Sequence, residues 1–410
     1  MIYFIDKFTG LSARFSLGYS MLTTLAIFNY RSLREIVLPL GQLNLITGAN
    51  GSGKSNLYKA LRLLAHTAQG GVVNALAQEG GLDSSFWAGP ENFTKSMLAG
   101  NTAIEATVRQ APKRLKLGFA GEDFSYLIEL GLPKPDATTL FGLDPQIKRE
   151  AIWNGPKYRP STVLVERRGP MVKSRSADGQ GWITLGAHLQ TGDSIFTELA
   201  DPERSPEVLK LRDSIRAWRF YDHFRTDAQA PARRPQLGTA TPVLHHDGRD
   251  LASAIQTIFE IGDKAAFDHA VSDAFPGAKV RIEPQAGGIL VIAFHQHGLL
   301  RPLYASELSD GTLRYLLLIA ALLTPRPPEL MVLNEPETSL HPDLLPALAR
   351  LIAKVSEECQ LWVVSHANRL INALSQFEHC NTLALDKTLG QTQIQGQDLL
   401  NTPSWLWQNR

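Results

Sequence analysis

A glycine-rich segment at residues 48–55, GANGSGKS, carries the clearest chemical pattern in the chain. It matches G-x-x-x-x-G-K-[S/T], in which glycines let successive backbone N–H groups point inward at phosphate oxygens. In such a loop Lys54 reaches the β- and γ-phosphates, and the Ser55 hydroxyl ligates Mg²⁺. We therefore expect ATP and Mg²⁺ as ligands. The residues expected to contact the nucleotide are Asn50, Gly51, Ser52, Gly53, Lys54 and Ser55.

A second polar group, Asn334 and Glu335, follows the apolar segment 329–333. In proteins with this loop, a neighbouring strand ends in an acid that holds Mg²⁺. Asn334 takes that position here as a metal ligand with one uncharged amide oxygen, so we expect weaker metal binding and slow turnover. Glu335 can orient and deprotonate an attacking water, which makes it the predicted catalytic base.

Two further segments place polar groups where a helix is expected to begin and where a strand is expected to end. Ser309 and Gly311 precede an apolar helix, where a hydroxyl and a glycine form a second anion site. The same residues are also typical of an ordinary helix cap. Residues 363–366 deliver His366 to the carboxyl end of a buried strand, where ligands of parallel sheets bind. A structural role is the alternative for this histidine.

Hydrophobic periodicity predicts the elements that position these residues. Two or three strands are expected within 22–47, and the last runs into the glycine-rich loop. A helix over 55–68 follows and ends at Gly70-Gly71. The later order is helix, strand, helix, strand, which predicts a parallel α/β sheet. These four elements are expected at 312–323, 330–333, 342–355 and 361–365.

The middle of the chain has a different pattern, with short strands separated by Gly, Pro and Asp turns. A helix is expected over 206–225, and a helical stretch over 249–275 is broken at Gly262. The short strands are expected at 103–109, 124–130, 162–166, 182–185, 279–283 and 289–295.

Composition narrows the class of protein. Of the 410 residues, 44% are hydrophobic and 20% are charged, so the chain can bury a sizeable core. Lys and Arg number 41 against 40 Asp and Glu, and this balance excludes binding to nucleic acid by bulk charge alone. Two cysteines make no disulfide framework, and the longest apolar run, 316–323, is too short to cross a bilayer. We expect a cytoplasmic protein without membrane contact.

In their order along the chain, the motifs resemble those of ABC-type ATPases. GANGSGKS is similar to the Walker A loop, ELSDGT to the LSGGQ signature, VLNEPE to Walker B, TSLHP to the D-loop and VVSH to the switch histidine. The start, FNYRSL, resembles RecF/SMC-like ATPases, among them the predicted ATPases of the AAA domain group that includes OLD-nuclease heads. The sequence resembles this family closely over residues 22–70 and 300–370 and only loosely over the residues between them.

Spacing separates the subclasses of this superfamily. Ser55 and Ser309 lie 254 residues apart (309 − 55). In transporter-type subunits of the superfamily these two motifs are much closer together, so a subunit of a membrane pump is not expected. Sustained heptads are missing, so long SMC arms are not expected. Only 44 residues follow His366 (410 − 366), too few for the nuclease domain of OLD proteins. The expectation is an ATPase head alone.

The resemblance implies roles within one chain. Lys54, Glu335 and His366 form the catalytic set, in which His366 senses the γ-phosphate. Arg31 and Ser32 lie near the base, or near the ribose and phosphates. The coupling glutamine of the superfamily is not identifiable, and Gln190 is a weak candidate.

The resemblance also implies a partner. Ser309 and Gly311 contact the γ-phosphate of a nucleotide held by a second copy, and Ser339, Leu340 and His341 line the dimer seam. The leading hypothesis is an ATP-hydrolysing, ATP-sandwiched head-to-tail homodimer that acts in DNA repair, DNA maintenance or phage defence, on DNA or an effector protein. The alternative is a nearly inactive nucleotide-regulated scaffold, or a regulatory subunit for a separate nuclease or toxin.

The implied fold is an α/β P-loop head of the ABC-ATPase type, with a mixed or parallel sheet, an antiparallel β-subdomain and a helical insertion. Residues 1–20 are interpreted as a non-native or disordered extension, the alternative being an extra strand. The other divisions are a lobe with Walker A and the β-subdomain at 21–200, a helical insertion or lid at 201–280, and a lobe with signature, Walker B, D-loop and switch histidine at 281–410.

Two segments, 148–175 and 206–225, combine basic and aromatic side chains. Such a combination can contact DNA phosphates and bases. A solvated strand face and an amphipathic helix are the plainer interpretation, which the balanced net charge favours.

Overall fold

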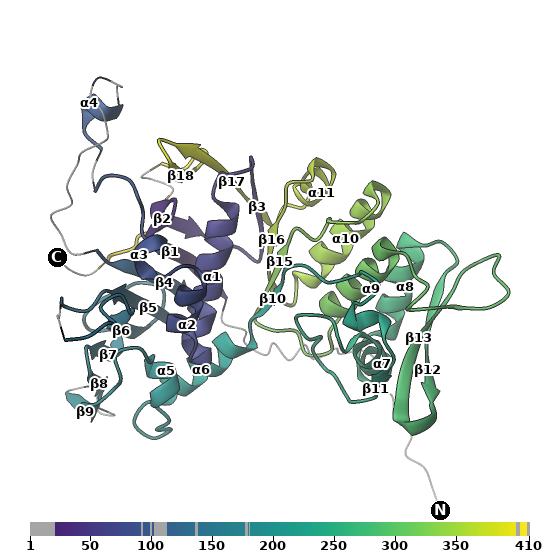
Figure 1. Ribbon diagram of the computed structural model, residues 1–410, viewed down its shortest axis with the longest axis horizontal. Helices are drawn as coiled ribbons and strands as arrows, with labels where there is room; N and C mark the ends of the chain where they lie inside the picture. Colours follow the sequence, from purple (N-terminus) through teal and green to yellow (C-terminus); the bar gives the residue numbers. More distant parts are fainter. Residues whose placement is uncertain are drawn as a thin grey trace, which may run out of the picture.

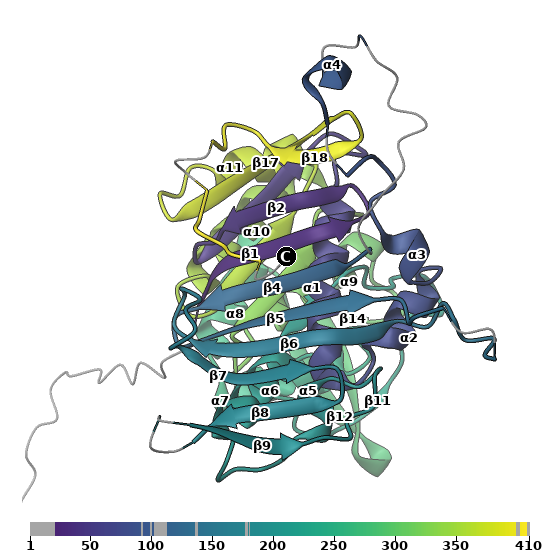
Figure 2. The same cartoon turned by 90° about the vertical axis from the view of Figure 1, so that its left-hand side faces the viewer.

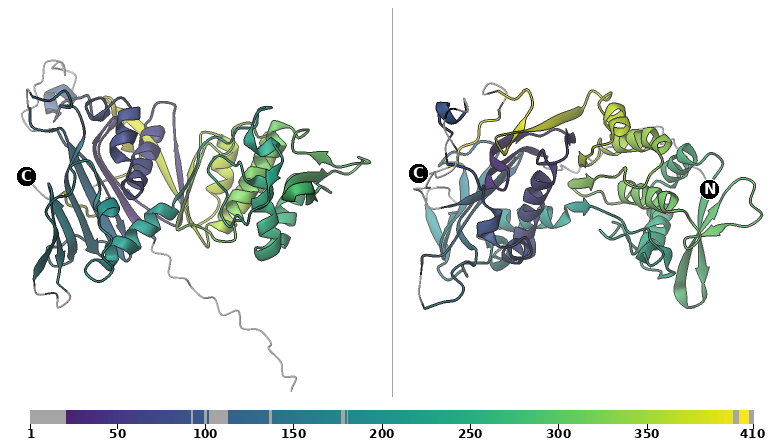
Figure 3. Two further views of the ribbon diagram at one scale, coloured as in Figure 1. Left: turned by 60° about the horizontal axis from the view of Figure 1, so that its bottom comes forward. Right: turned by 45° about the horizontal axis from the view of Figure 1, so that its top comes forward.

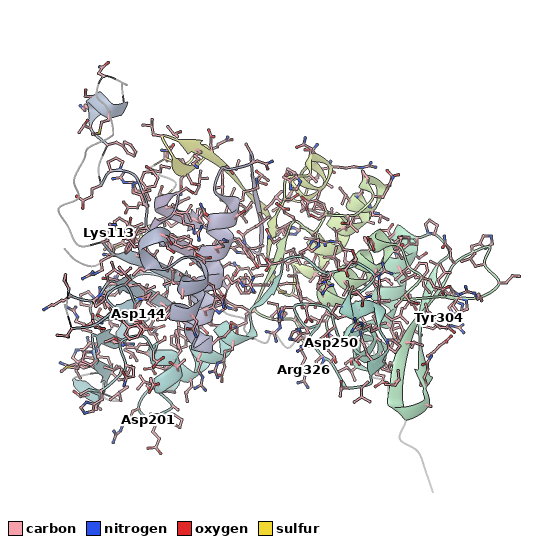
Figure 4. All side chains as sticks on the ribbon, in the orientation of Figure 1. Lys113, Asp144, Asp201, Asp250, Tyr304 and Arg326 are labelled. Carbon is pink, nitrogen blue, oxygen red and sulfur yellow. The ribbon has the colours of Figure 1, made fainter. Side chains whose placement is uncertain are left out.

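The computed structural model describes residues 21–91, 93–98, 101, 113–135, 138–176, 179, 181–398 and 402–407. The expected extension at 1–20 and the strand expected at 103–109 lie outside the described residues. Sheets and helices follow one another in layers along the longest axis of the molecule (Figure 1). In Figure 4, Lys113, just before β4, and Tyr304 of β14 lie toward opposite ends of this axis.

An antiparallel outer sheet of 8 strands forms one end of the molecule (Figure 2). Each strand pairs antiparallel with its neighbours, and tight turns suffice for such connections. In spatial order the strands are β2 (Leu33–Pro39), β1 (Leu22–Tyr30), β4 (Leu115–Gly121), β5 (Phe124–Gly131), β6 (Gln146–Asn154), β7 (Val163–Arg168), β8 (Met171–Arg175) and β9 (Trp182–Gly186).

A central sheet of 6 strands carries most of the residues predicted to do chemistry. Its strands run parallel except for β18, which returns antiparallel to β17. The α/β class with a mixed sheet and an antiparallel sheet is thereby confirmed. In spatial order the strands are β10 (Arg219–Tyr221), β15 (Leu330–Asn334), β16 (Gln360–Val364), β3 (Leu43–Gly48), β17 (Cys380–Thr388) and β18 (Gln391–Ile394).

Helices cover both faces of the central sheet. α1 (Lys54–Gln69) lies between the central and outer sheets, while α9 (Asp310–Leu322), α10 (Leu345–Val355) and α11 (Asn368–Leu374) lie on the opposite face (Figures 1 and 3). The strands are buried on both faces and therefore read as continuous apolar runs. In β15, for example, Val332 packs in the core on the α1 side and Leu333 in the core on the α9 side.

A 4-stranded small sheet and two helices complete the α9 side of the molecule. These are α7 (Leu251–Ile261), α8 (Lys264–Ala274), β11 (Gln236–Leu237), β12 (Lys279–Gln285), β13 (Ile289–His295) and β14 (Leu303–Tyr304). The α-helices on the other side are α2 (Val72–Gln78), α3 (Leu82–Ser85), α4 (Lys95–Leu98), α5 (Ile195–Glu198) and α6 (Pro206–Ala217). Throughout the described ranges, every helix is too short or too polar to span a membrane.

Several predicted elements are confirmed and one is wrong. The helix predicted over 55–68 is α1, and the break predicted at Gly262 separates α7 from α8. The helix predicted over 206–225 ends at Ala217, because the following residues join the parallel sheet as β10 beside β15. Sheet pairing here overrides the apolar periodicity that favoured a longer helix.

Candidate nucleotide-binding site

The glycine-rich loop connects the carboxyl end of β3 to the first residue of α1, as its pattern predicts. Gly48 and Gly53 have φ angles of 142° and 114°, which side chains disfavour. A Cβ at Gly53 would also lie 2.1 Å from Thr392 Oγ1. Lys54 Nζ donates to the carbonyls of Gly48 at 2.6 Å and Ala49 at 3.1 Å. The loop thus presents a helix N-terminus and an ammonium group together, which suits a polyphosphate.

A chain of side-chain hydrogen bonds supports the glycine-rich loop. Thr392 of β18 donates its hydroxyl proton to the Ser52 carbonyl at 2.8 Å, so its oxygen accepts from the Ser32 hydroxyl at 2.7 Å. Ser32 in turn accepts from the Asn56 amide at 2.8 Å. The structure thus places Ser32 in the support of the loop, and its expected position near the base, or near the ribose and phosphates, stays a prediction. No sequence motif indicated Thr392, which comes from a distant hairpin.

Arg31, which was predicted to lie near the nucleotide, forms an ion pair with Glu79. Its Nη2 lies 3.0 Å from Glu79 Oε2, which also accepts from the Tyr30 hydroxyl at 2.6 Å. Burial and the nearby Glu79 raise the pKa of Tyr30, which keeps this hydroxyl a donor. Sequence reasoning missed Glu79, which follows the last turn of α2.

A cavity of about 530 Å³ opens beside Ser55 and is called here the Ser55 cavity. Its volume lies within the range of about 300–1,000 Å³ that is typical of ligand sites. Arg62 of α1 pairs with Asp222 across it. The residues that matter for its chemistry are Ser55, Lys59, Arg62, Glu79, Asp222 and Asn334. The structure therefore brings Ser55 and Asn334, the two predicted metal ligands, to one cavity.

Glu335 and His366 also meet at this edge of the sheet. His366 Nδ1 lies 3.6 Å from Glu335 Oε1 and 3.5 Å from Glu337 Oε1. Glu335 has a φ of 49° and donates its N–H to the Val364 carbonyl at 2.8 Å. A left-handed φ at a non-glycine residue is a strained conformation that often marks a functional site.

Glu337 holds the loop that carries His366. This buried carboxylate accepts through Oε1 from the Ser365 hydroxyl at 2.7 Å and from the N–H groups of His366 and Ala367 at 3.0 and 3.2 Å. Sequence reasoning quoted Glu337 within VLNEPE but gave it no role. Its signal was a second acid immediately after Pro336.

Arg314 connects α9 to the same edge. The buried guanidinium donates to the Phe224 carbonyl at 3.2 Å and to the Glu335 carbonyl at 3.4 Å, and it lies 3.0 Å from His223 Nδ1. Burial lowers the pKa of Arg314. The helix that begins at the signature segment is thus tied to the Walker B strand within one chain.

The signature and D-loop residues predicted to contact a second copy lie side by side and are exposed or half-buried. Ser309 caps α9 by accepting from the Thr312 N–H at 3.1 Å, so the helix-cap interpretation holds for the chain alone. A Cβ at Gly311 would lie 3.0 Å from the Ser339 carbonyl, which places the two segments side by side. Ser309 and Gly311 do not line the Ser55 cavity of their own chain. His341 is exposed on the same loop, and Leu340 is partly buried.

Gln190 lies elsewhere. It belongs to the connection between β9 and α5, where its carbonyl accepts from Arg167 at 2.7 Å. Arg167 is fully buried and pairs with Glu150 at 3.0 Å at the outer sheet. Gln190 is absent from the lining of the Ser55 cavity, so its candidacy as the coupling glutamine has no support from position.

Several cations of the two basic segments have partners within the chain. Arg149 and Arg168 share Glu166 at 2.9 and 3.0 Å, and Lys210 pairs with Asp123 at 3.0 Å. Such pairing reduces the positive charge offered to a nucleic acid and fits the plainer interpretation of a strand face and a helix. Contact with DNA stays a prediction.

A protein-family profile described as "AAA domain, putative AbiEii toxin, Type IV TA system" matches residues 43–372. The chain belongs to this AAA-domain family. The matched range contains the phosphate loop, the signature, Walker B and the switch histidine, so the resemblance inferred from the motifs is confirmed. Membership of the AAA-domain family supports nucleotide binding at the loop.

Among curated proteins, the OLD nuclease of Thermus scotoductus is 25% identical over 361 residues. The match covers 85% of this chain and 59% of that protein, so the chain spans less than two thirds of its relative's length.

Two solved structures cover nearly the whole chain. One is an SmcHead bound to the C-winged helix domain of ScpA, with a TM-score of 0.48, 13% identity and coverage of 93% of this chain and 99% of that one. The other is an SMC head domain from Thermotoga maritima, with a TM-score of 0.46, 15% identity and coverage of 92% and 100%.

Proposed function

We propose that this AAA-domain protein binds and hydrolyses ATP at the Ser55 cavity. The observation that carries the proposal is the meeting of three groups at one edge of the central sheet. These are the loop with Lys54, the cavity wall with Ser55 and Asn334, and the pair of Glu335 and His366. The carboxyl edge of a parallel sheet is where such ligands bind.

Each group has a defined task in this reaction. The loop N–H groups and Lys54 bind the phosphates and stabilise charge on the transferred phosphoryl group. Glu335 accepts a proton from the attacking water, and His366, held by Glu337, orients the terminal phosphate. Mg²⁺, when bound, neutralises phosphate charge. The Ser55 hydroxyl and the Asn334 amide would hold it, because both line the cavity and oxygen donors of this kind fit Mg²⁺.

The proposal includes a head-to-tail dimer of two copies. Ser309 and Gly311 are away from the cavity of their own chain, exposed or partly so, next to the D-loop residue Ser339. A hydroxyl and a glycine at the N-terminus of α9 form an anion site that a nucleotide on a second copy can complete. ATP then joins the two copies, and hydrolysis releases them.

The decisive experiment compares the oligomeric state and phosphate release of wild type, Glu335→Gln and Lys54→Ala. We expect Glu335→Gln to lose hydrolysis and to elute as a dimer with ATP and Mg²⁺, because the amide cannot take the proton from water. Lys54→Ala should lose both binding and dimerisation. The control is Glu357→Gln, an exposed acid before the amino end of β16 and thus at the opposite edge of the sheet. A monomeric Glu335→Gln with ATP bound would contradict the dimer.

Asn334 favours a second candidate function, a nucleotide-regulated scaffold with very slow turnover. An amide in place of an acid weakens the metal site, so binding without appreciable hydrolysis is the expected behaviour of such a scaffold. Phosphate release separates the two candidates, because a scaffold loses no release when Lys54 is replaced. The effector, nuclease, toxin or DNA on which the protein acts is best sought among the proteins and nucleic acids that co-purify with Glu335→Gln.

A further inference from the structure

Asp222 stands beside Asn334 at the carboxyl edge of the central sheet, although no motif pointed to it. β10 and β15 are neighbouring parallel strands in which Tyr221 lies opposite Leu333. Asn334 is the last residue of β15 and Asp222 is the first residue after β10, so the backbone places them at the same level.

Both side chains also point to the same face of the sheet. Phe220 and Val332 pack in the core on the α1 side, and Tyr221 and Leu333 pack in the core on the α9 side. Because side chains alternate along a strand, the next residue of each strand returns to the α1 side. The ring centroids of Phe220 and Tyr58 of α1 are 5.8 Å apart, so this face is in contact with α1. Asp222, Asn334 and Ser55 accordingly line one cavity.

Only one of the two oxygens of the Asp222 carboxylate accepts a hydrogen bond of good geometry. Oδ2 accepts from Arg62 of α1. Oδ1 is buried and accepts no hydrogen bond of good geometry among the residues that the structure describes. The Tyr58 hydroxyl is also close to this carboxylate, and burial together with Asp222 raises the pKa of Tyr58. A buried carboxylate oxygen without a donor is costly, and a cation in the cavity would relieve that cost.

We propose that Asp222 supplies the carboxylate ligand of the Mg²⁺ that accompanies the nucleotide, an inference that rests on the proposed function. The ligand set of the chain is then the Asp222 carboxylate, the Ser55 hydroxyl and the Asn334 amide. Mg²⁺ is typically bound by one or two carboxylates together with phosphates and waters. The negative charge that Asn334 does not provide is present on the adjacent strand, and Arg62 fixes the carboxylate by holding its second oxygen.

The test measures how much Mg²⁺ a fluorescent ATP analogue needs for half-maximal binding. Asp222→Asn should raise this Mg²⁺ concentration by at least about 10-fold, because loss even of a group that only supports a metal ligand has an effect of about 10- to 100-fold. Adding Asn334→Asp to that variant should restore the requirement, because the charge returns on the neighbouring strand. The matched control is Asp227→Asn, since Asp227 lies in the same segment, is exposed and pairs with Arg225 at 2.8 Å. Its Mg²⁺ requirement should equal that of wild type.

The outcomes separate the inference from the proposed function. If wild type binds no nucleotide, the proposed function is wrong. If wild type binds nucleotide through Lys54 but Asp222→Asn needs no more Mg²⁺ than Asp227→Asn, the role of Asp222 is wrong and the proposed function stands. If circular dichroism finds Asp222→Asn unfolded, Arg62→Met replaces it as the test. Losing the group that holds Oδ2 should raise the Mg²⁺ requirement, and an unchanged or lower requirement would overturn the inference.

Discussion

The Thr392 hydroxyl fixes the shape of the phosphate loop although it lies far from the loop in sequence. It donates to the Ser52 carbonyl, and the Thr392 side chain, with its hydroxyl oxygen nearest, fills the space that a Cβ at Gly53 would occupy. The Ser32 hydroxyl and the Asn56 amide continue the same chain of hydrogen bonds. A loop whose N–H groups are held in place before the phosphates arrive binds them with less loss of conformational entropy.

We predict that Thr392→Val weakens ATP binding about fivefold, the equivalent of ~1 kcal/mol for one lost hydrogen bond. Valine keeps the shape beside Gly53, so the effect isolates the hydroxyl. Equilibrium titration with a fluorescent ATP analogue measures the affinity. Thr388→Val, on an exposed threonine of the same hairpin, is the control and should bind ATP like wild type. Equal affinities for the two variants would contradict a role for Thr392.

Arg314 of α9 connects its helix to two other parts of the fold. It extends from the second turn of α9 to the segment after β10 and to the first residue after β15. The signature end of α9 and the Walker B strand are therefore held in one position relative to each other. An arginine is suited to this because its fork donates several hydrogen bonds in fixed directions.

We predict that Arg314→Met lowers the free energy of unfolding by about 1–3 kcal/mol, because the buried Phe224 carbonyl loses its donor. Urea denaturation followed by circular dichroism measures the change. Arg350→Met provides the comparison, since Arg350 is an exposed arginine of α10 that pairs with Asp273 at 2.7 Å. An exposed pair contributes about 0–1 kcal/mol, so this variant should lose less. A smaller loss for Arg314→Met than for Arg350→Met would contradict the prediction.

Local patterns were sufficient to predict the elements around the phosphate loop. Glycine spacing and helical periodicity are properties of neighbouring residues, so β3, the loop and α1 follow from the sequence alone. The helix predicted over 206–225 was wrong past Ala217 because β10 has only three residues and depends on pairing with β15. Three residues are too few to show the alternation of apolar and polar side chains by which a strand is predicted.

The parts of the site that were missed come from tertiary pairing. Asp222 reaches the cavity because β10 lies next to β15, and Thr392 reaches the loop because β18 turns back beside it. Glu79 does so because α2 folds against α1. Nothing in their immediate neighbours in sequence distinguishes these residues from ordinary surface acids or strand threonines.

At the scale of the whole molecule, the loop leads into α1 and the signature leads into α9, and these helices lie on opposite faces of the central sheet (Figure 1). Gly311 lies against the Ser339 carbonyl, while Lys54 lies over the carbonyls of its own loop. In a symmetric pair of copies, each site would then combine the loop of one copy with the signature of the other. Two damaged chains can therefore complement each other.

We predict that a mixture of Lys54→Ala and Gly311→Glu regains ATP hydrolysis although each variant alone is inactive. Because ATP joins the copies and neither variant alone has an intact site, only mixed dimers are expected to form. Each mixed dimer has one intact site of two, so at most about half of wild-type phosphate release is expected. The measurement is phosphate release at equal total protein concentration. Mixing Lys54→Ala with Lys54→Ala/Gly311→Glu is the control and should stay inactive. No recovery in the first mixture would exclude shared sites.

The strand order of the central sheet has a consequence for synthesis of the chain on the ribosome. β3 pairs with residues 361–364 of β16 and 380–385 of β17, whereas most strands of the outer sheet pair with neighbours in sequence. The outer sheet can thus assemble while the chain is still emerging, but β3 must wait until more than three hundred further residues have been translated. During that interval the glycine-rich loop is made but has no sheet to hold it, so nucleotide capture becomes available only after β16 and β17 have been translated.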